Sequence, residues 1–178
     1  MNYASIENVF EFMQKNCKKI LKISLPVDDF GNTSFLVTFT INYISGLYIH
    51  EKDSAMLASA EKNLSLFIGR PIELRAADGY LKDGDTITIG DIVFTVLETP
   101  GHTPGGISLY TDKGSVFSGD TLFYLSVGRT DFPGGSMRQL NESIKTKLFT
   151  LPDKTAVYPG HGPATDIGTE KEQNPFIF

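Results

Sequence analysis

Three short segments of this chain share one layout, and this repetition constrains the fold more than any other feature of the sequence. Each segment is an apolar run of strand-forming residues that leads to a glycine and then to a residue able to bind a metal ion. The segments are 94–102, 116–120 and 156–161. A strand that ends in this way delivers its last side chain to the carboxyl edge of a sheet, where α/β folds commonly place their sites. The layout therefore predicts one shared site at a sheet edge.

The residues that close the three segments are two histidines and an aspartate. Glycine lets the chain turn sharply before each of them, so we expect His102, Asp120 and His161 to converge. Two imidazoles and a carboxylate suit zinc, iron or manganese. A single histidine after a strand is ordinarily a turn residue, but here two of the chain's three histidines occupy the same Pro-Gly-His tripeptide. The repetition favours a metal site. His50 lacks such a context, and we interpret it as the residue that starts a helix.

The rest of the chain alternates between helix and strand patterns. Apolar residues at helical spacing predict helices over 5–20 and 53–66, and a third helix begins at Ser136, where Gln139 has capping-box spacing. β-branched and aromatic residues predict strand structure over 34–48. Further strands are expected at 86–89, 92–97, 107–110, 115–117 and 156–158, the first two as a hairpin. The interleaving predicts a layered α/β domain.

Length and charge narrow the class of protein. The chain has 178 residues, of which 40% are hydrophobic, and we expect one domain over 1–178 in which 23–44 is atypical. The formal charge is −5 and no Lys/Arg run exceeds Lys18-Lys19, so nucleic acid is not an expected partner. No apolar run approaches the roughly 20 residues of a membrane helix, and the lone Cys17 excludes an intrachain disulfide. We expect a cytoplasmic protein that does not bind membranes.

Four successive motifs resemble those of metallo-β-lactamase-fold hydrolases, and in particular their small glyoxalase II-like, or hydroxyacylglutathione hydrolase-like, branch. The motifs are TPGHTPGG at 99–106, SGDTLF at 118–123, VGRTDFPGGS at 127–136 and YPGHGP at 158–163. The closing stretch, with Glu170, Lys171 and Asn174-Pro175-Phe176, is similar to the end of the same branch. The resemblance is ordered and dense from about residue 47 onward. It implies an αβ/βα sandwich, truncated or altered at its amino-terminal side.

The resemblance also implies a two-metal centre and a reaction. By motif, His102 would serve the first metal, Asp120 would bridge both and act in catalysis, and His161 would serve the second. Zinc, or iron or manganese, would activate water to attack a thioester or related small acyl substrate, typically an acyl-glutathione-like compound. Arg129, in the loop beyond Asp120, is a candidate contact for an anionic substrate group, and a purely structural role for this arginine is an equal alternative.

The chain departs from the family at the leading motif, H-x-H-x-D-H. No histidine precedes His50, and only Asp28 and Asp29 are conceivable ligands in that region. A stable catalytic zinc has about three protein ligands, so metal occupancy should be low. Two alternatives to the two-metal hydrolase stay open. One is a non-catalytic or vestigial member that acts as a binding domain or has no activity, and the other is a single-iron centre as in persulfide dioxygenases.

The strands that usually precede the first helix of this family also have no counterpart before residue 5 of this sequence. A sheet without its outer strands exposes an unpaired edge and part of its core. Homodimerisation is one way to cover such an edge, so a second copy of the chain is a candidate partner.

Overall fold

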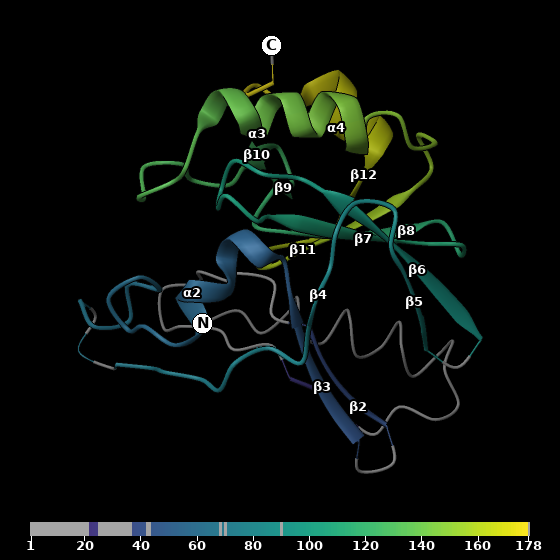
Figure 1. Ribbon diagram of the computed structural model, residues 1–178. Coiled ribbons are helices and arrows are strands. Elements are labelled where there is room, and N and C mark those ends of the chain that lie inside the picture. The colour runs from purple at the N-terminus through teal and green to yellow at the C-terminus, as the bar shows by residue number, and fades with distance from the viewer. Residues whose placement is uncertain are drawn as a thin grey trace.

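The structure of the protein is a computed structural model. It describes residues 22–24, 37–41, 44–67, 69, 71–89 and 91–177. The helix expected over 5–20 and the aspartates Asp28 and Asp29 lie outside the described residues. The described strands form a six-stranded sheet, a four-stranded sheet and a two-stranded hairpin (Figure 1).

The six-stranded sheet contains all three segments that the sequence singled out. Its strands are β5 (Thr86–Ile89), β6 (Ile92–Glu98), β7 (Ile107–Thr111), β8 (Ser115–Gly119), β11 (Ala156–Pro159) and β12 (Thr165–Asp166). Their order is β12-β11-β8-β7-β6-β5. The β8–β11 pair is parallel and the other neighbouring pairs are antiparallel. The expected hairpin and the three strands expected after it are confirmed.

The four-stranded sheet includes part of the segment that the sequence marked as atypical. Its strands are β1 (Lys22–Ser24), β2 (Val37–Ile41), β3 (Ile44–Ile49) and β4 (Gly79–Tyr80), in that order. β2 and β3 pair antiparallel, with Val37 opposite Tyr48 and Ile41 opposite Ile44. The strand structure expected over 34–48 is therefore confirmed within the described residues. A separate small hairpin pairs β9 (Leu122–Phe123) with β10 (Ser126–Val127).

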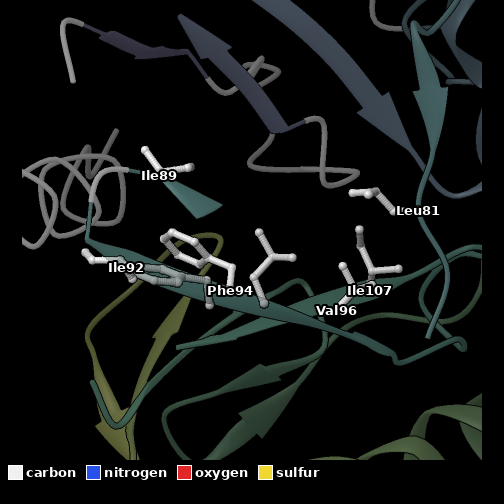
Figure 2. Packing of buried hydrophobic residues seen from close by; sticks show 8 residues of the cluster. Leu81, Ile89, Ile92, Phe94, Val96 and Ile107 are labelled. Carbon is white, nitrogen blue, oxygen red and sulfur yellow. The ribbon is translucent and has the colours of Figure 1, made fainter. Parts of the chain in front are cut away.

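The two faces of the six-stranded sheet contribute to two different hydrophobic cores. Successive residues of a strand point to opposite faces, so Phe117 of β8 joins one core and its neighbour Val116 joins the other. Tyr48 of β3 packs against the first core, so this core lies between the two sheets. Figure 2 shows how its side chains pack. Its buried members are Leu81, Ile89, Ile92, Phe94, Val96, Ile107, Leu109 and Phe117.

Helices cover the outer face of the six-stranded sheet. They are α3 (Met137–Ser143), the π-helical turn η2 (Ile144–Leu148) and α4 (Ile167–Gln173), and Figure 1 shows α3 and α4 on the same side of this sheet. The hydroxyl of Ser136 accepts a hydrogen bond from the Gln139 amide at 3.3 Å, so α3 begins where the sequence predicted. The second core lies under these helices and contains Val116, Leu122, Leu140, Ile144, Leu148, Val157 and Ile167.

The helix predicted over 53–66 is much shorter than expected. A 3₁₀ turn, η1 (Glu51–Asp53), leads to α2 (Ser54–Leu57), and the chain then continues in turns. The side-chain amide of Asn63 donates to the carbonyls of Met56 and Ile72, and such bonds compete with helix geometry. His50 stands at the amino-terminal cap of η1, as the sequence predicted.

The layers stack as helix, sheet, sheet and helix. Leu57 of α2 packs with Leu47 and Ile49 of β3 in a third cluster, on the face of the four-stranded sheet opposite Tyr48. This arrangement is the expected αβ/βα sandwich. Within the part of the chain that the structure describes, no helix has the length and apolar character needed to cross a membrane.

Candidate functional site

The strands β6, β8 and β11 run in the same direction and end at one edge of the six-stranded sheet. β11 is parallel to β8, and β7 is antiparallel to both β6 and β8. His102 follows β6, Asp120 follows β8 and His161 follows β11. The sheet therefore brings the three segments to a common edge, as their layout predicted.

Two of the three glycines that precede these residues need their conformational freedom. Gly101 has φ 140° and Gly119 has φ 53°, in the region that L side chains rarely adopt. A Cβ on Gly101 would lie 2.3 Å from the backbone nitrogen of Leu140. Gly160 is not among the residues with positive φ, so the same explanation does not extend to His161.

His102 is buried, and a hydrogen bond at its Nδ1 atom fixes the orientation of its ring. Its Nδ1 atom lies 2.7 Å from the carbonyl oxygen of Arg129. A carbonyl only accepts hydrogen bonds, so Nδ1 carries a proton, and in its neutral form a ring held in this way presents a lone pair at Nε2. That Nε2 atom lies 3.6 Å from Oδ2 of Asp120, whose side chain is also buried. The pair therefore presents an imidazole lone pair and a carboxylate to the same space.

The loop that carries His102 is held by a second buried carboxylate, Asp53. Its oxygens accept hydrogen bonds from the Thr103 hydroxyl at 2.5 Å and from the Gly105 amide at 2.7 Å. A Cβ on Gly105 would lie 2.7 Å from the Asp53 carboxyl carbon, so only glycine fits there. Burial raises the pKa of Asp53 above its usual value, against the opposing effect of these two hydrogen bonds. Asp53 thus links α2 to the His102 loop.

His161 lies on the other side of the site and is more exposed. Its ring stacks on Phe123 of β9, with ring centroids 4.3 Å apart and an interplanar angle of 28°. Stacking on an aromatic neighbour restricts the plane of the ring. His161 is therefore positioned by an aromatic contact, whereas His102 is positioned by a hydrogen bond.

All three predicted residues line one pocket of about 320 Å³. That volume is within the range of small-molecule sites. The β9–β10 hairpin and the loop that follows it form much of the wall. The lining residues are His102, Asp120, Phe123, Tyr124, Ser126, Val127, Gly128, Arg129, His161, Gly162 and Pro163. The backbone packs tightly here, because a Cβ on Gly128 would lie 1.8 Å from the carbonyl oxygen of Asp120.

The donors at this site fit a divalent cation only in part. Two atoms bound to one tetrahedral zinc lie roughly 3.3 Å apart, and the 3.6 Å between His102 Nε2 and Asp120 Oδ2 is close to that spacing. Over the described ranges, however, no group of three or more His, Cys, Asp or Glu side chains is placed to hold a metal ion. His161 shares the pocket without completing such a group. The pocket therefore offers one paired donor set and a separate third donor.

Arg129 lines the pocket, but its guanidinium already has a partner. Its Nε and Nη2 atoms donate to the two carboxylate oxygens of Asp131 at 2.7 and 2.6 Å, and its Cζ lies 4.0 Å from the centroid of Phe132. The hydrogen bonds from Arg129 lower the pKa of Asp131 to about 2. An anionic ligand at this arginine would compete with Asp131. The carbonyl of Arg129 has a second role, as the acceptor for His102.

Several residues that shape the site were not predicted from the sequence. Phe123 and Tyr124 form part of the pocket wall. Asp53, which is distant from His102 in the sequence, binds the loop that carries this histidine. The Phe-Tyr pair directly follows the Gly-Asp-Thr-Leu motif, so its position was a usable signal. Asp53 gave no such signal, because an acidic residue at the start of a helix is ordinarily explained by capping.

Comparisons with known proteins identify the family of this chain. The profile of the metallo-beta-lactamase superfamily matches residues 41–161, which is more than half of the chain. This protein belongs to the metallo-beta-lactamase superfamily.

Its similar relatives include named hydrolases. The chain is 42% identical over 133 residues to the probable metallo-hydrolase YqgX of Bacillus subtilis, covering 74% of this chain and 63% of that protein. It is 38% identical over 130 residues to the hydroxyacylglutathione hydrolase GloC of Haemophilus influenzae, covering 72% and 61%. The chain thus spans less than two thirds of the length of these relatives.

Two solved structures are similar in fold and sequence. One is BLEG-1, described as a B3 metallo-beta-lactamase, at 44% identity and a TM-score of 0.71, covering 74% of this chain and 65% of that one. The other is TTHA1623 in a di-iron-bound form, at 39% identity and a TM-score of 0.65, covering 73% and 64%. Relatives with this fold therefore hold metal ions, and the αβ/βα sandwich is confirmed.

Proposed function

We propose that this chain is a metal-dependent hydrolase of the glyoxalase II-like type, which cleaves a thioester or a related acyl substrate in the cytoplasm. The observation that carries the proposal is the oriented donor pair, with His102 Nε2 facing the Asp120 carboxylate across 3.6 Å at a small-molecule pocket. The similarity to YqgX and GloC supports the reaction class. The names of those proteins describe longer chains, so the substrate assigned to this chain is a proposal.

Each donor has a distinct role in this scheme. His102 offers its Nε2 lone pair because its Nδ1–H is held by the Arg129 carbonyl. Asp120 supplies a buried negative charge that draws a cation into the pocket, and His161 is the third donor. Zinc, iron or manganese bound there would supply the Lewis acidity that activates water near neutral pH and polarises the acyl carbonyl.

The wall of the pocket suits an acyl substrate. Phe123, Tyr124 and Val127 offer apolar surface for an acyl chain. Arg129 offers positive charge at the same wall, where an anionic substrate group would displace Asp131 from its bidentate pair. Binding therefore combines apolar contacts with one exchangeable ion pair.

Metal content and thioester turnover, measured on the same preparation, test the proposal. The purified protein is loaded with zinc, iron or manganese, dialysed, and assayed with S-lactoylglutathione. We expect bound metal and turnover in the wild type, and loss of both in Asp120→Ala. Asp112→Ala removes an exposed carboxylate from the β7–β8 turn and is the matched control. Wild-type protein that retains metal and still fails to cleave any thioester would contradict the proposed reaction.

A second candidate is a non-catalytic domain that binds a small acyl ligand in the same pocket. The observation that favours it is the lack of a three-donor group among the described residues. Two protein donors leave most of the coordination of a zinc ion to solvent, which weakens binding. A metal-free, inert protein that still binds S-lactoylglutathione in a calorimetric titration would support this alternative.

A further inference from the structure

A fully buried carboxylate lies behind the wall of the pocket and takes no part in the donor set. Glu170 of α4 is 1% exposed. Its two oxygens accept hydrogen bonds from the backbone amide of Leu125 at 3.2 and 3.1 Å, from the Thr165 hydroxyl at 2.7 Å and from the Asn174 side-chain amide at 2.7 Å. A buried carboxylate is stable only when such donors satisfy it. Glu170 therefore joins three separate parts of the chain.

Asn174 extends this network by a second contact with the same hairpin. Its side-chain NH₂ also donates to the carbonyl of Ser126 at 3.0 Å, and its side-chain oxygen accepts from the Phe176 amide at 3.0 Å. These bonds fix which way the amide group points. Glu170 and Asn174 thus hold two consecutive residues of the chain, Leu125 through its N–H and Ser126 through its C=O.

The segment held in this way is the turn of the β9–β10 hairpin, and it is strained. Tyr124 and Leu125 connect the two strands, and Leu125 has φ 50°. A non-glycine residue in that region is disfavoured and persists where its surroundings enforce it. The hydrogen bond from the Leu125 amide to Glu170 supplies that enforcement. The turn conformation therefore depends on a side chain from the carboxyl-terminal helix.

The same carboxylate connects to His161 from two sides. The hairpin carries Phe123, on which the His161 ring stacks. Thr165, a few residues beyond His161, begins β12 and binds Glu170 directly. One anchor thus sets both the aromatic surface under His161 and the chain that follows this histidine.

We propose that Glu170, supported by Asn174, is a positioning residue that sets the orientation of His161 on Phe123 and the shape of the hairpin wall that contacts the substrate. The inference rests on the proposed function, because it assigns the residues that shape the same pocket. Glu170 touches neither the pocket nor a ligand. It acts through the turn at Leu125 and through Thr165.

The test is Glu170→Gln, with Glu172→Gln as the matched control. Glu172 is exposed on the same helix, so its substitution removes the same charge without touching the network. A glutamine at 170 replaces one carboxylate oxygen with an NH₂ group, which cannot accept hydrogen bonds from the existing donors. The chain has only three histidines, so their ring signals are readily assigned by NMR. Stacking on Phe123 should shift the His161 ring protons upfield in the wild type.

We expect Glu170→Gln to move the His161 ring signals back toward free histidine and to speed hydrogen exchange at Leu125, while the His50 ring signals stay unchanged. Glu172→Gln should match the wild type. In an active, metal-loaded enzyme, kcat/KM for S-lactoylglutathione should fall roughly tenfold or more in Glu170→Gln. A folded Glu170→Gln protein with wild-type His161 signals and Leu125 exchange would overturn the proposal.

Two further measurements keep the test decisive. If Glu170→Gln does not fold, Thr165→Val removes one bond at nearly constant volume, and it should shift the His161 signals in the same direction by a smaller amount. Unchanged His161 signals in a folded Thr165→Val protein would then overturn the proposal. If the wild type hydrolyses no thioester, the proposed function fails, and the ring signals still decide the positioning role because they need neither metal nor substrate.

Discussion

The carbonyl oxygen of Arg129 lies 2.7 Å from Nδ1 of His102, so the backbone of one predicted site residue orients the side chain of another. The guanidinium of the same arginine points to Asp131. Arg129 therefore has two separable functions, one that any residue could supply through its backbone and one that requires its side chain.

This separation predicts the behaviour of Arg129→Ala. The carbonyl remains, so we expect the His102 ring to keep its proton on Nδ1 and its lone pair on Nε2. The lost ion pair is exposed to solvent, so we expect little change in the free energy of unfolding. ¹⁵N NMR of the imidazole nitrogens reports the tautomer directly. A switch of the proton to Nε2 in this variant would show that the arginine side chain, rather than its backbone, controls His102.

The same variant should change the titration of Asp131. Hydrogen bonds from Arg129 lower the pKa of this carboxyl from 3.8 to about 2, so Arg129→Ala should return it toward 3.8. Because the folded-state pKa is lowered, the pair stabilises the fold above pH 3.8 and loses this contribution as the pH falls toward 2. A carboxyl ¹³C titration measures the shift, and Asp112, whose ion-pair partner is Lys113 rather than an arginine, serves as the reference in the same spectrum. A pKa of Asp131 that stays near 2 without the arginine would refute the assigned cause.

Gly128 should tolerate no side chain. A Cβ there would lie 1.8 Å from the carbonyl oxygen of Asp120, and neither backbone segment can yield without moving Asp120 or Arg129. We expect Gly128→Ala to lower the free energy of unfolding by about 3 kcal/mol in urea denaturation. Gly162 is the matched control, because it lines the same pocket but its Cβ would meet open space. Its φ of 80° alone should cost about 1–2 kcal/mol in Gly162→Ala. Equal losses in the two variants would contradict the steric argument.

Local sequence patterns were sufficient to predict the strands and the common edge. The alternating run of strand-forming residues over 92–97 identified β6, and the Pro-Gly-His and Gly-Asp motifs marked where β6, β8 and β11 end. These features depend on residues that are close together in the chain. The start of α3 was also predicted correctly, because the capping bond between Ser136 and Gln139 is equally local.

Contacts between distant residues were not predictable in the same way. The 53–66 segment has the apolar spacing of a helix, but Asn63 and Ser65 bind Ile72 across a turn and end the helix early. The network around Glu170 joins residues 125 and 170, and no periodicity relates such positions. The separation of His161 from the His102–Asp120 pair is a property of side-chain packing, which a motif does not specify.

Asp53 makes another contact between distant residues, because it joins the start of α2 to the loop of His102. Removing its carboxylate in Asp53→Ala leaves the Gly105 amide without its acceptor and costs about 1–3 kcal/mol. The variant no longer has to bury a charged carboxylate, which offsets part of that loss, since burial raises the pKa of Asp53. We expect a net loss of about 2 kcal/mol in urea denaturation, with faster hydrogen exchange at Gly105.

Asp53→Asn keeps one acceptor and should lose less, and Glu51→Ala, an exposed acid of the same 3₁₀ turn, should lose almost nothing. If Glu51→Ala were as destabilising as Asp53→Ala, the loss would come from the charge at the helix start, and the link between Asp53 and the His102 loop would carry no measurable energy.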